Sequence, residues 1–286
     1  MAEIITIKQD ISLANDLLAA DPSDELNVWW LGQAGFAFRF GKFSILIDPY
    51  LSDSLAKKYK SSEFPHIRMM IPPMKSDEAR NVNYILCTHR HTDHMDAETI
   101  MPVLANNPGC KCLFPRAWEK YIIEFGTKEE DLITINNEEV VNLNDKISVK
   151  AIPSAHESLE VDEEGNHLYL GYIIKFKNIT IYHSGDCVPY CGLLENLQKY
   201  KIDVAFLPVN GRDETRRSRG VPGNFTFEEA SKLCMEAKIS YLIPHHFGLF
   251  DFNTISLDEL NSKIAKIKYK GLTTIVPEIN KKYRLI

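Results

Sequence analysis

Three histidines and one aspartate stand within six residues, directly after an apolar run at residues 84–87 that predicts a buried strand. His89 and His91 are two residues apart, so in a locally extended segment both project to the same side and can hold one ion. Asp93 and His94 are adjacent and diverge, which suits them to a second ion. The spacing H-x-H-x-D-H favours a metal site for zinc, manganese or iron over a polar loop with solvent-exposed histidines.

Length and composition indicate one globular domain over residues 1–286. The apolar content of 44% is ample for a sizeable core, and no linker rich in Gly, Ser or Pro interrupts the chain. The net charge of −6 gives no electrostatic footprint for nucleic acid. Residues 1–10 have neither a basic segment nor an apolar one, and no run of about 18 apolar residues follows. We therefore expect a soluble cytoplasmic protein that binds neither nucleic acid nor membrane, and the sequence leaves room for a homo-oligomer.

The six cysteines are scattered along the chain and do not form a disulfide framework. Cys110 and Cys112 form a C-x-C motif, but no second pair completes a set of four thiolates. We expect ordinary reduced cysteines.

Hydrophobic periodicity predicts strands that alternate with helices in each half of the chain. We expect helices at residues 97–105, 116–125, 226–237 and 257–267, and strands at residues 26–31, 35–40, 43–47, 111–114, 132–135, 139–143, 147–152, 169–176, 179–182, 203–209, 241–243, 273–276 and 283–286. Residues 52–80 show no clean period, and such an insertion could form a lid over a site.

Two further motifs accompany the histidine cluster: the run Trp-Trp-Leu-Gly at residues 29–32 and the run Tyr-His-Ser-Gly-Asp at residues 182–186. Together they resemble the metallo-β-lactamase fold superfamily, and within it the L-ascorbate-6-phosphate lactonase branch. The matching motifs extend from about Trp29 to Gly248. The resemblance implies an α/β (α+β) fold, a four-layer αββα sandwich of two sheets face to face with helices outside, which agrees with strands and covering helices in each half.

The resemblance also completes the set of metal ligands. His156 would join His89 and His91 at the first ion, although a lone histidine after a strand is usually no ligand. His246 would join Asp93 and His94 at the second ion, and an exchange with His245 is the alternative. Asp186 would bridge both ions, or else it caps a helix at residues 190–199.

Three residues are expected to support these ligands. In the superfamily an aspartate at the place of Asp48 lies close to the ligands and supports them. The alternative is that Asp48 belongs to a simple turn that ends a strand. His183 and His245 are neighbours of ligands and are expected beside them.

Four arginines, Arg212, Arg216, Arg217 and Arg219, follow the strand expected at residues 203–209. Guanidinium groups suit phosphate or carboxylate recognition, so we expect this loop to contact a small anionic substrate. The alternative is a solvated loop that Asp213 and Glu214 partly neutralise.

These assignments predict a hydrolase with two divalent ions, zinc or manganese, with iron as a further candidate. A hydroxide held by the ions would be the nucleophile, and Asp93 would be the catalytic residue that orients it or transfers its proton. The resemblance favours a lactonase for a small phosphorylated sugar acid. A phosphodiesterase or nuclease is the alternative, and a non-hydrolytic metal-binding or redox protein ranks lowest, since redox members of the superfamily usually have glutamate at the place of His91.

Overall fold

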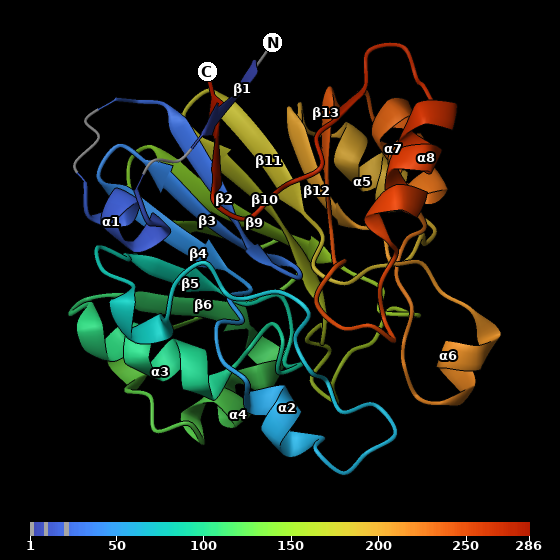
Figure 1. Cartoon of the computed structure of the whole chain (residues 1–286). Coiled ribbons are helices and arrows are strands. Elements are labelled where there is room, and N and C mark those ends of the chain that lie inside the picture. The colour runs from blue at the N-terminus through green and yellow to red at the C-terminus, as the bar shows by residue number, and fades with distance from the viewer. Residues whose placement is uncertain (1–2, 9–10, 20–22) are drawn as a thin grey trace. The chain divides into compact units, whose positions relative to one another are not determined.

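The computed structural model describes residues 3–8, 11–19 and 23–286. Two compact units make up the chain. The first unit combines the described part of residues 2–135 with residues 278–286, and the second unit spans residues 136–277. Each contains one sheet and several helices (Figure 1), as the expected mixed α/β class requires. That the whole chain is a single domain stays a prediction.

The first unit contains an eight-stranded sheet in the order β1-β15-β2-β3-β4-β5-β6-β7. The strands are β1 (Ile4–Lys8), β2 (Leu26–Gly32), β3 (Gly35–Phe40), β4 (Phe43–Ile47), β5 (Tyr84–Leu86), β6 (Lys111–Pro115), β7 (Leu132–Ile135) and β15 (Lys281–Leu285). Strands β1 to β4, with β15 among them, pair antiparallel, whereas β4 to β7 are parallel.

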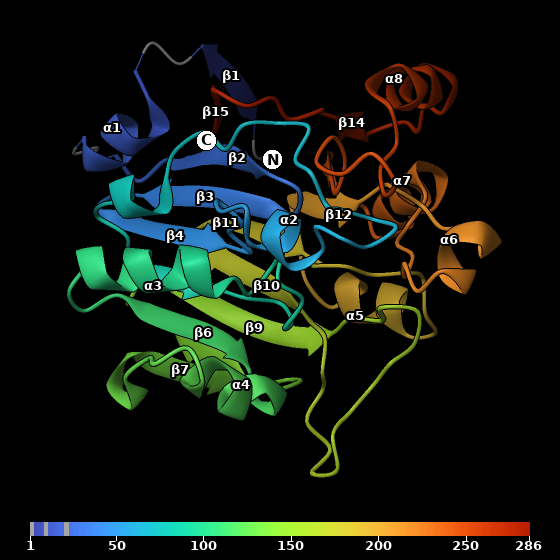
Figure 2. The ribbon, with the colours of Figure 1, turned by 60° about the horizontal axis from the view of Figure 1, so that its bottom comes forward.

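Helices α1 (Leu13–Leu18), α2 (Ser54–Lys58), α3 (Ala97–Asn106) and α4 (Glu119–Ile123) belong to the same unit, with short 3-10 turns η1 (Ser76–Glu78), η2 (Arg116–Trp118) and η3 (Glu129–Asp131). Helices α3 and α4 lie along one side of β4 to β7 (Figure 2). Trp29 and Leu31 of β2, Leu17 of α1 and Val103 of α3 belong to one buried apolar cluster. Because alternate residues of a strand share a face, this cluster fixes which face of β2 meets the helices.

The second unit contains a seven-stranded sheet in the order β14-β13-β12-β11-β10-β9-β8. Its strands are β8 (Val140–Asn142), β9 (Ile147–Pro153), β10 (Leu170–Phe176), β11 (Ile179–His183), β12 (Val204–Pro208), β13 (Tyr241–His245) and β14 (Thr273–Thr274), and its helices are α5 (Leu193–Gln198), α6 (Glu214–Ser218), α7 (Phe227–Glu236) and α8 (Leu257–Lys266). Strands β11, β12 and β13 run parallel. Their carboxyl ends therefore meet at one edge of the sheet, where β11 ends at His183 and the chain segments that carry Asp186 and His246 begin.

Most expected elements are confirmed, and the differences have local causes. Residues 52–80 contain α2 and η1, both shorter than the window in which helical periodicity is visible. The helix expected at residues 116–125 begins as η2 and continues as α4. In the described part of the chain, no helix is long and apolar enough to span a bilayer.

Candidate functional site

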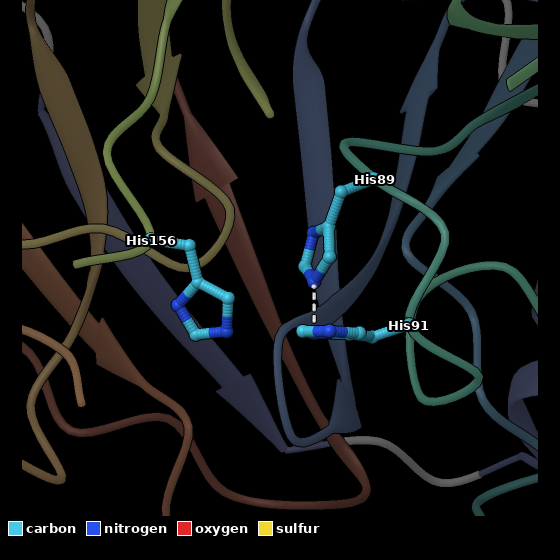
Figure 3. A group of neighbouring side chains, drawn as sticks. All are labelled: His89, His91 and His156. Carbon is cyan, nitrogen blue, oxygen red and sulfur yellow. Dashed lines mark hydrogen bonds between the residues drawn. The ribbon is translucent and has the colours of Figure 1, made fainter. Parts of the chain in front are cut away.

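The first unit places four predicted ligands on the loop between β5 and α3. His89 and His94 are buried, and His91 and the Asp93 side chain are partly exposed. His89 Nε2 and His91 Nδ1 face one another at 3.0 Å (Figure 3). His94 Nε2 lies 3.8 Å from Asp93 Oδ2. The loop thus brings all four side chains together, as the spacing predicted.

Asp48, at the end of β4, holds this loop through Thr88. Thr88 donates its backbone N–H to Asp48 Oδ1 at 2.8 Å and its hydroxyl to Asp48 Oδ2 at 2.7 Å. His94 Nδ1 lies 2.8 Å from the same Oδ2. Asp48 thus contacts two residues of the loop that carries the predicted ligands, and it also follows a strand; that it supports metal ligands stays a prediction.

These partners assign the tautomers of two imidazoles. A carboxylate can only accept, so His94 Nδ1 carries the proton. The Thr88 hydroxyl hydrogen is used on Asp48, so its oxygen accepts from His89 Nδ1 at 3.0 Å. In the neutral form both histidines therefore offer Nε2 as a lone pair, the state in which imidazole binds metal, and a carboxylate partner of this kind is typical of metal-ligating histidines.

Gln33 is a member of the site that the sequence analysis missed. It lies between β2 and β3, and its Nε2 donates to Asp93 Oδ2 at 3.0 Å. No pattern in the sequence distinguishes it, because its partner is 60 residues away. Thr88 was missed for a similar reason, since its contacts depend on the pairing of β4 with β5.

The second unit brings together the remaining three predicted ligands. Asp186 follows β11, His246 follows β13, and His156 follows β9. Asp186 Oδ2 lies 3.1 Å from His246 Nε2 and 3.8 Å from His156 Nε2. All three residues are at least nine-tenths buried. A buried carboxylate oxygen between two imidazoles suits a site that holds a cation.

The turn that carries Asp186 is fixed from two sides. The Ser154 hydroxyl lies within hydrogen-bond distance of the Ser184 and Asp186 carbonyl oxygens, at 2.8 and 3.0 Å. On the other side, the Gly185 N–H donates to His183 Nδ1 at 3.1 Å. The alternative role of Asp186 as a helix cap is excluded, because α5 begins at Leu193 with Gly192 as its N-cap.

The rings of His183 and His245 stack on one another. Their centroids are 4.9 Å apart with an interplanar angle of 8°, and both residues are fully buried. His183 accepts from Gly185 and so cannot use Nδ1 for a metal. Within the second unit, His246 rather than His245 has the contact with Asp186.

The arginine loop is more ordered than expected, because residues 214–218 form α6 with Asp213 as its N-cap. Arg212 makes a bidentate ion pair with Glu229, at 2.7 Å for both contacts. Arg216 contacts Asp213 and Asn253. Arg217 pairs with Glu157 at 3.1 Å but stays half exposed, and Arg219 is exposed. Arg212 and Arg216 thus have structural partners, and substrate contact by any of the four stays a prediction.

The cysteines do not add a thiolate to either set. None of the six, all of which lie in the described residues, forms a disulfide, and five are buried. Burial raises the pKa of Cys110 to about 12, and burial likewise raises the pKa of Cys87 well above its usual value. The candidate ligand groups are imidazoles and carboxylates, which suit zinc, manganese and iron.

Comparison with known proteins shows which family this chain belongs to. The model of the β-lactamase superfamily domain matches residues 44–247. A UPF0173 metal-dependent hydrolase of Pyrococcus furiosus is 30% identical over 228 residues, which is 78% of this chain and 85% of that protein. A UPF0173 metal-dependent hydrolase of Saccharolobus solfataricus is 27% identical over 261 residues, 86% of this chain and 94% of that protein.

Solved structures show the same fold at low identity. The metallo-β-lactamase fold protein YhfI of Bacillus subtilis has a TM-score of 0.62 at 15% identity and covers 90% of this chain and 99% of its own. Isothiocyanate hydrolase from Delia radicum gut bacteria has a TM-score of 0.70 at 16% identity, with 90% and 97% covered. The resemblance to the superfamily and the predicted fold class are confirmed. The chain belongs to the β-lactamase superfamily, in the family of the UPF0173 metal-dependent hydrolases.

Proposed function

We propose that this protein is a divalent-metal-dependent hydrolase, and that its substrate is a lactone of a small anionic sugar acid, most simply a phosphorylated one. The observation that carries the proposal is the tautomer assignment through Asp48 and Thr88, which prepares His89 and His94 as ligands through Nε2. The names of the relatives agree with this class of enzyme.

In this proposal the predicted ligands would hold two ions. His89, His91 and His156 would serve one ion, Asp93, His94 and His246 the other, and Asp186 both. Bound divalent ions would supply Lewis acidity and lower the pKa of water from about 15.7 to about 7.

Asp93 has the properties needed to hold or move a proton. Gln33 holds one of its oxygens, and 17% of its side chain is exposed, so a substrate can reach it. Its carboxylate would take a proton at the start of the reaction and return it to the leaving group. The lactone assignment is supported by the Trp-Trp-Leu-Gly and His-Ser-Gly-Asp motifs, together with the exposed arginines Arg217 and Arg219.

Metal analysis and an activity panel test the proposal. We expect about two divalent ions per chain and hydrolysis of lactones in preference to phosphodiesters and β-lactams. Chelation should abolish turnover, and zinc or manganese should restore it. Full activity after exhaustive metal removal would contradict the enzyme class, and preferential phosphodiester cleavage would contradict the substrate alone.

Replacement of Asp93 tests its role in proton transfer. Asp93→Asn keeps the shape of the side chain but removes the base, so we expect kcat to fall by about a hundred-fold or more while KM changes little. Metal content must be measured in parallel, because Asp93 is also a proposed ligand. A variant that keeps both ions and its kcat would remove Asp93 from the chemistry.

The exposed arginines allow a test of the anionic group. A charge-assisted guanidinium contact contributes about 1.5 to 3 kcal/mol, so losing one should lower kcat/KM about ten- to a hundred-fold. We expect this loss for Arg217→Ala or Arg219→Ala on a phosphorylated lactone and not on its unphosphorylated analogue. Arg212→Ala is the matched control, because Arg212 makes a bidentate ion pair with Glu229 and its side chain is 29% exposed, whereas the Arg217 side chain makes one close contact with Glu157 and is 52% exposed. Equal losses on both substrates would remove these arginines from substrate recognition.

A further inference from the structure

Backbone strain marks a residue that the ligand sets do not include. In the described part of the chain ten non-glycine residues have positive φ, and the buried ones among them are Gln33, Asp48 and His246. Such backbone is unfavourable for residues with a side chain, and it persists where the surroundings impose it, often at functional sites. Asp48 contacts the loop that carries the first ligand set, and His246 belongs to the second. Gln33 has the same kind of backbone, with φ of 50°.

The turn around Gln33 is built to hold this conformation. Gly32 pairs with Gly35, so Gln33 and Ala34 form the connection between β2 and β3. The Trp30 indole N–H donates to the Gln33 carbonyl oxygen at 3.0 Å, inside the core. Glycine or asparagine would adopt this φ with less strain. The backbone therefore gives no reason for glutamine at this position.

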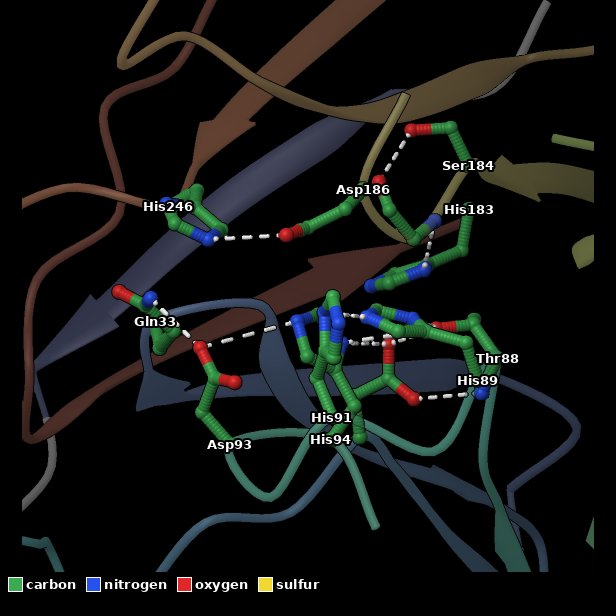
Figure 4. A network of polar contacts seen from close by, with 12 residues as sticks. Gln33, Thr88, His89, His91, Asp93, His94, His183, Ser184, Asp186 and His246 are labelled. Carbon is green, nitrogen blue, oxygen red and sulfur yellow. Dashed lines mark hydrogen bonds and ion pairs between the residues drawn. The ribbon is translucent and has the colours of Figure 1, made fainter. Parts of the chain in front are cut away.

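The side chain gives that reason. Gln33 is 1% exposed, and its Nε2 donates to Asp93 Oδ2 at 3.0 Å (Figure 4). An amide nitrogen is a donor without charge, so it can fix the rotation of a carboxylate without competing for a cation. Asparagine, one methylene shorter, would not span the same distance from the same backbone.

We propose that Gln33 is a positioning residue for Asp93: its amide donates to Oδ2, the oxygen that lies 3.8 Å from His94 Nε2, and so fixes the plane in which the carboxylate meets the other predicted ligands. The inference rests on the proposed metal-dependent function. Residues that orient metal ligands affect metal affinity about ten- to a hundred-fold. The strained backbone at Gln33 is maintained because it brings the amide within reach of Asp93.

Two substitutions separate this role from a structural one. Gln33→Met keeps length and approximate volume but removes the donor, and Gln33→Asn suits positive φ but is too short. Lys177→Asn is the matched control, because Lys177 has φ of 52° in the exposed turn between β10 and β11. Zinc affinity of the full chain is measured against a chelating indicator, and denaturant unfolding is measured on the metal-free protein.

We expect zinc to bind both Gln33 variants about ten- to a hundred-fold more weakly than wild type, with the control unchanged. The metal-free Gln33→Asn protein should unfold at a midpoint close to that of wild type. A purely structural role would instead lower the unfolding midpoints and leave zinc affinity unchanged, and that result would overturn the inference. If wild type itself binds no divalent ion, the proposed function fails and this inference with it, so the two failures are distinguishable.

Discussion

At the scale of single residues, Thr88 links the loop between β5 and α3, which carries four predicted ligands, to Asp48 and to the His89 ring. It is 1% exposed, and its one hydroxyl both donates to Asp48 and accepts from His89. A buried donor or acceptor that loses its partner costs about 1–3 kcal/mol, whereas a retained hydrogen bond contributes only about 1 kcal/mol net. Removing this hydroxyl would therefore cost free energy mainly because a buried oxygen of Asp48 and the Nδ1 of His89 would each lose a hydrogen-bond partner.

We expect Thr88→Val, which has nearly the same shape, to lower the free energy of unfolding of the metal-free protein by about 1–3 kcal/mol. Thr88→Ser is the control, because it keeps the hydroxyl and loses one methyl group, and it should cost less than about 1.5 kcal/mol. Denaturant unfolding at neutral pH measures both. Equal stability of wild type and Thr88→Val would mean that the hydroxyl does not organise the loop.

At the scale of elements, α7 shows how a local signal and a long-range contact combine. Thr226 and Glu229 form a capping box at the start of α7, and Arg212 adds two contacts to the Glu229 carboxylate. Burial tends to raise the pKa of Glu229, but the hydrogen bonds from Arg212 and from the Thr226 N–H outweigh it and lower that pKa. The charged form of Glu229 therefore stabilises the fold.

This pKa shift predicts a pH dependence. A carboxyl group whose pKa is lowered by folding stabilises the protein above its unfolded pKa of about 4.3, and this contribution is lost as the pH falls through the folded pKa. Glu229→Gln should cost about 1 kcal/mol between about pH 5 and pH 8. Its difference from wild type should shrink below about pH 4. A difference that persists undiminished in acid would show that the charge is not responsible.

The elements also show what could be predicted from the sequence. Hydrophobic periodicity and the spacing of the histidines are local patterns, so α7 and the proximity of His89, His91, Asp93 and His94 could be predicted from the sequence. Helix α2 was missed, because five residues are too few to show a period. The roles of Thr88, Gln33 and Ser154 depend on contacts between distant strands. Such contacts are absent from any local pattern.

At the scale of the whole molecule, the chain returns to the first unit after completing the second. Strand β15 follows residue 277 in sequence, yet it lies between β1 and β2 and pairs with both. Tyr283 and Leu285 of this strand are buried. The core of the first unit is therefore complete only when the last residues of the chain are in place.

A substitution in β15 tests the prediction of a single domain. Leu285→Ala removes a fully buried side chain and should lower the free energy of unfolding by about 2–5 kcal/mol. Lys281→Ala on the same strand is the control, because the Lys281 side chain is 36% exposed, and it should change stability by less than about 0.5 kcal/mol.

Amide hydrogen exchange then measures the free energy of opening in each of the two units separately. In a single cooperative domain the slowest amides exchange only by global unfolding, so Leu285→Ala should lower the free energy of exchange equally in β2 and β3 of the first unit and in β10 and β11 of the second. If the units unfold independently, only the first-unit strands should lose protection. Unchanged protection in β10 and β11, beside a loss of about 2 kcal/mol or more in β2 and β3, would contradict the single-domain prediction.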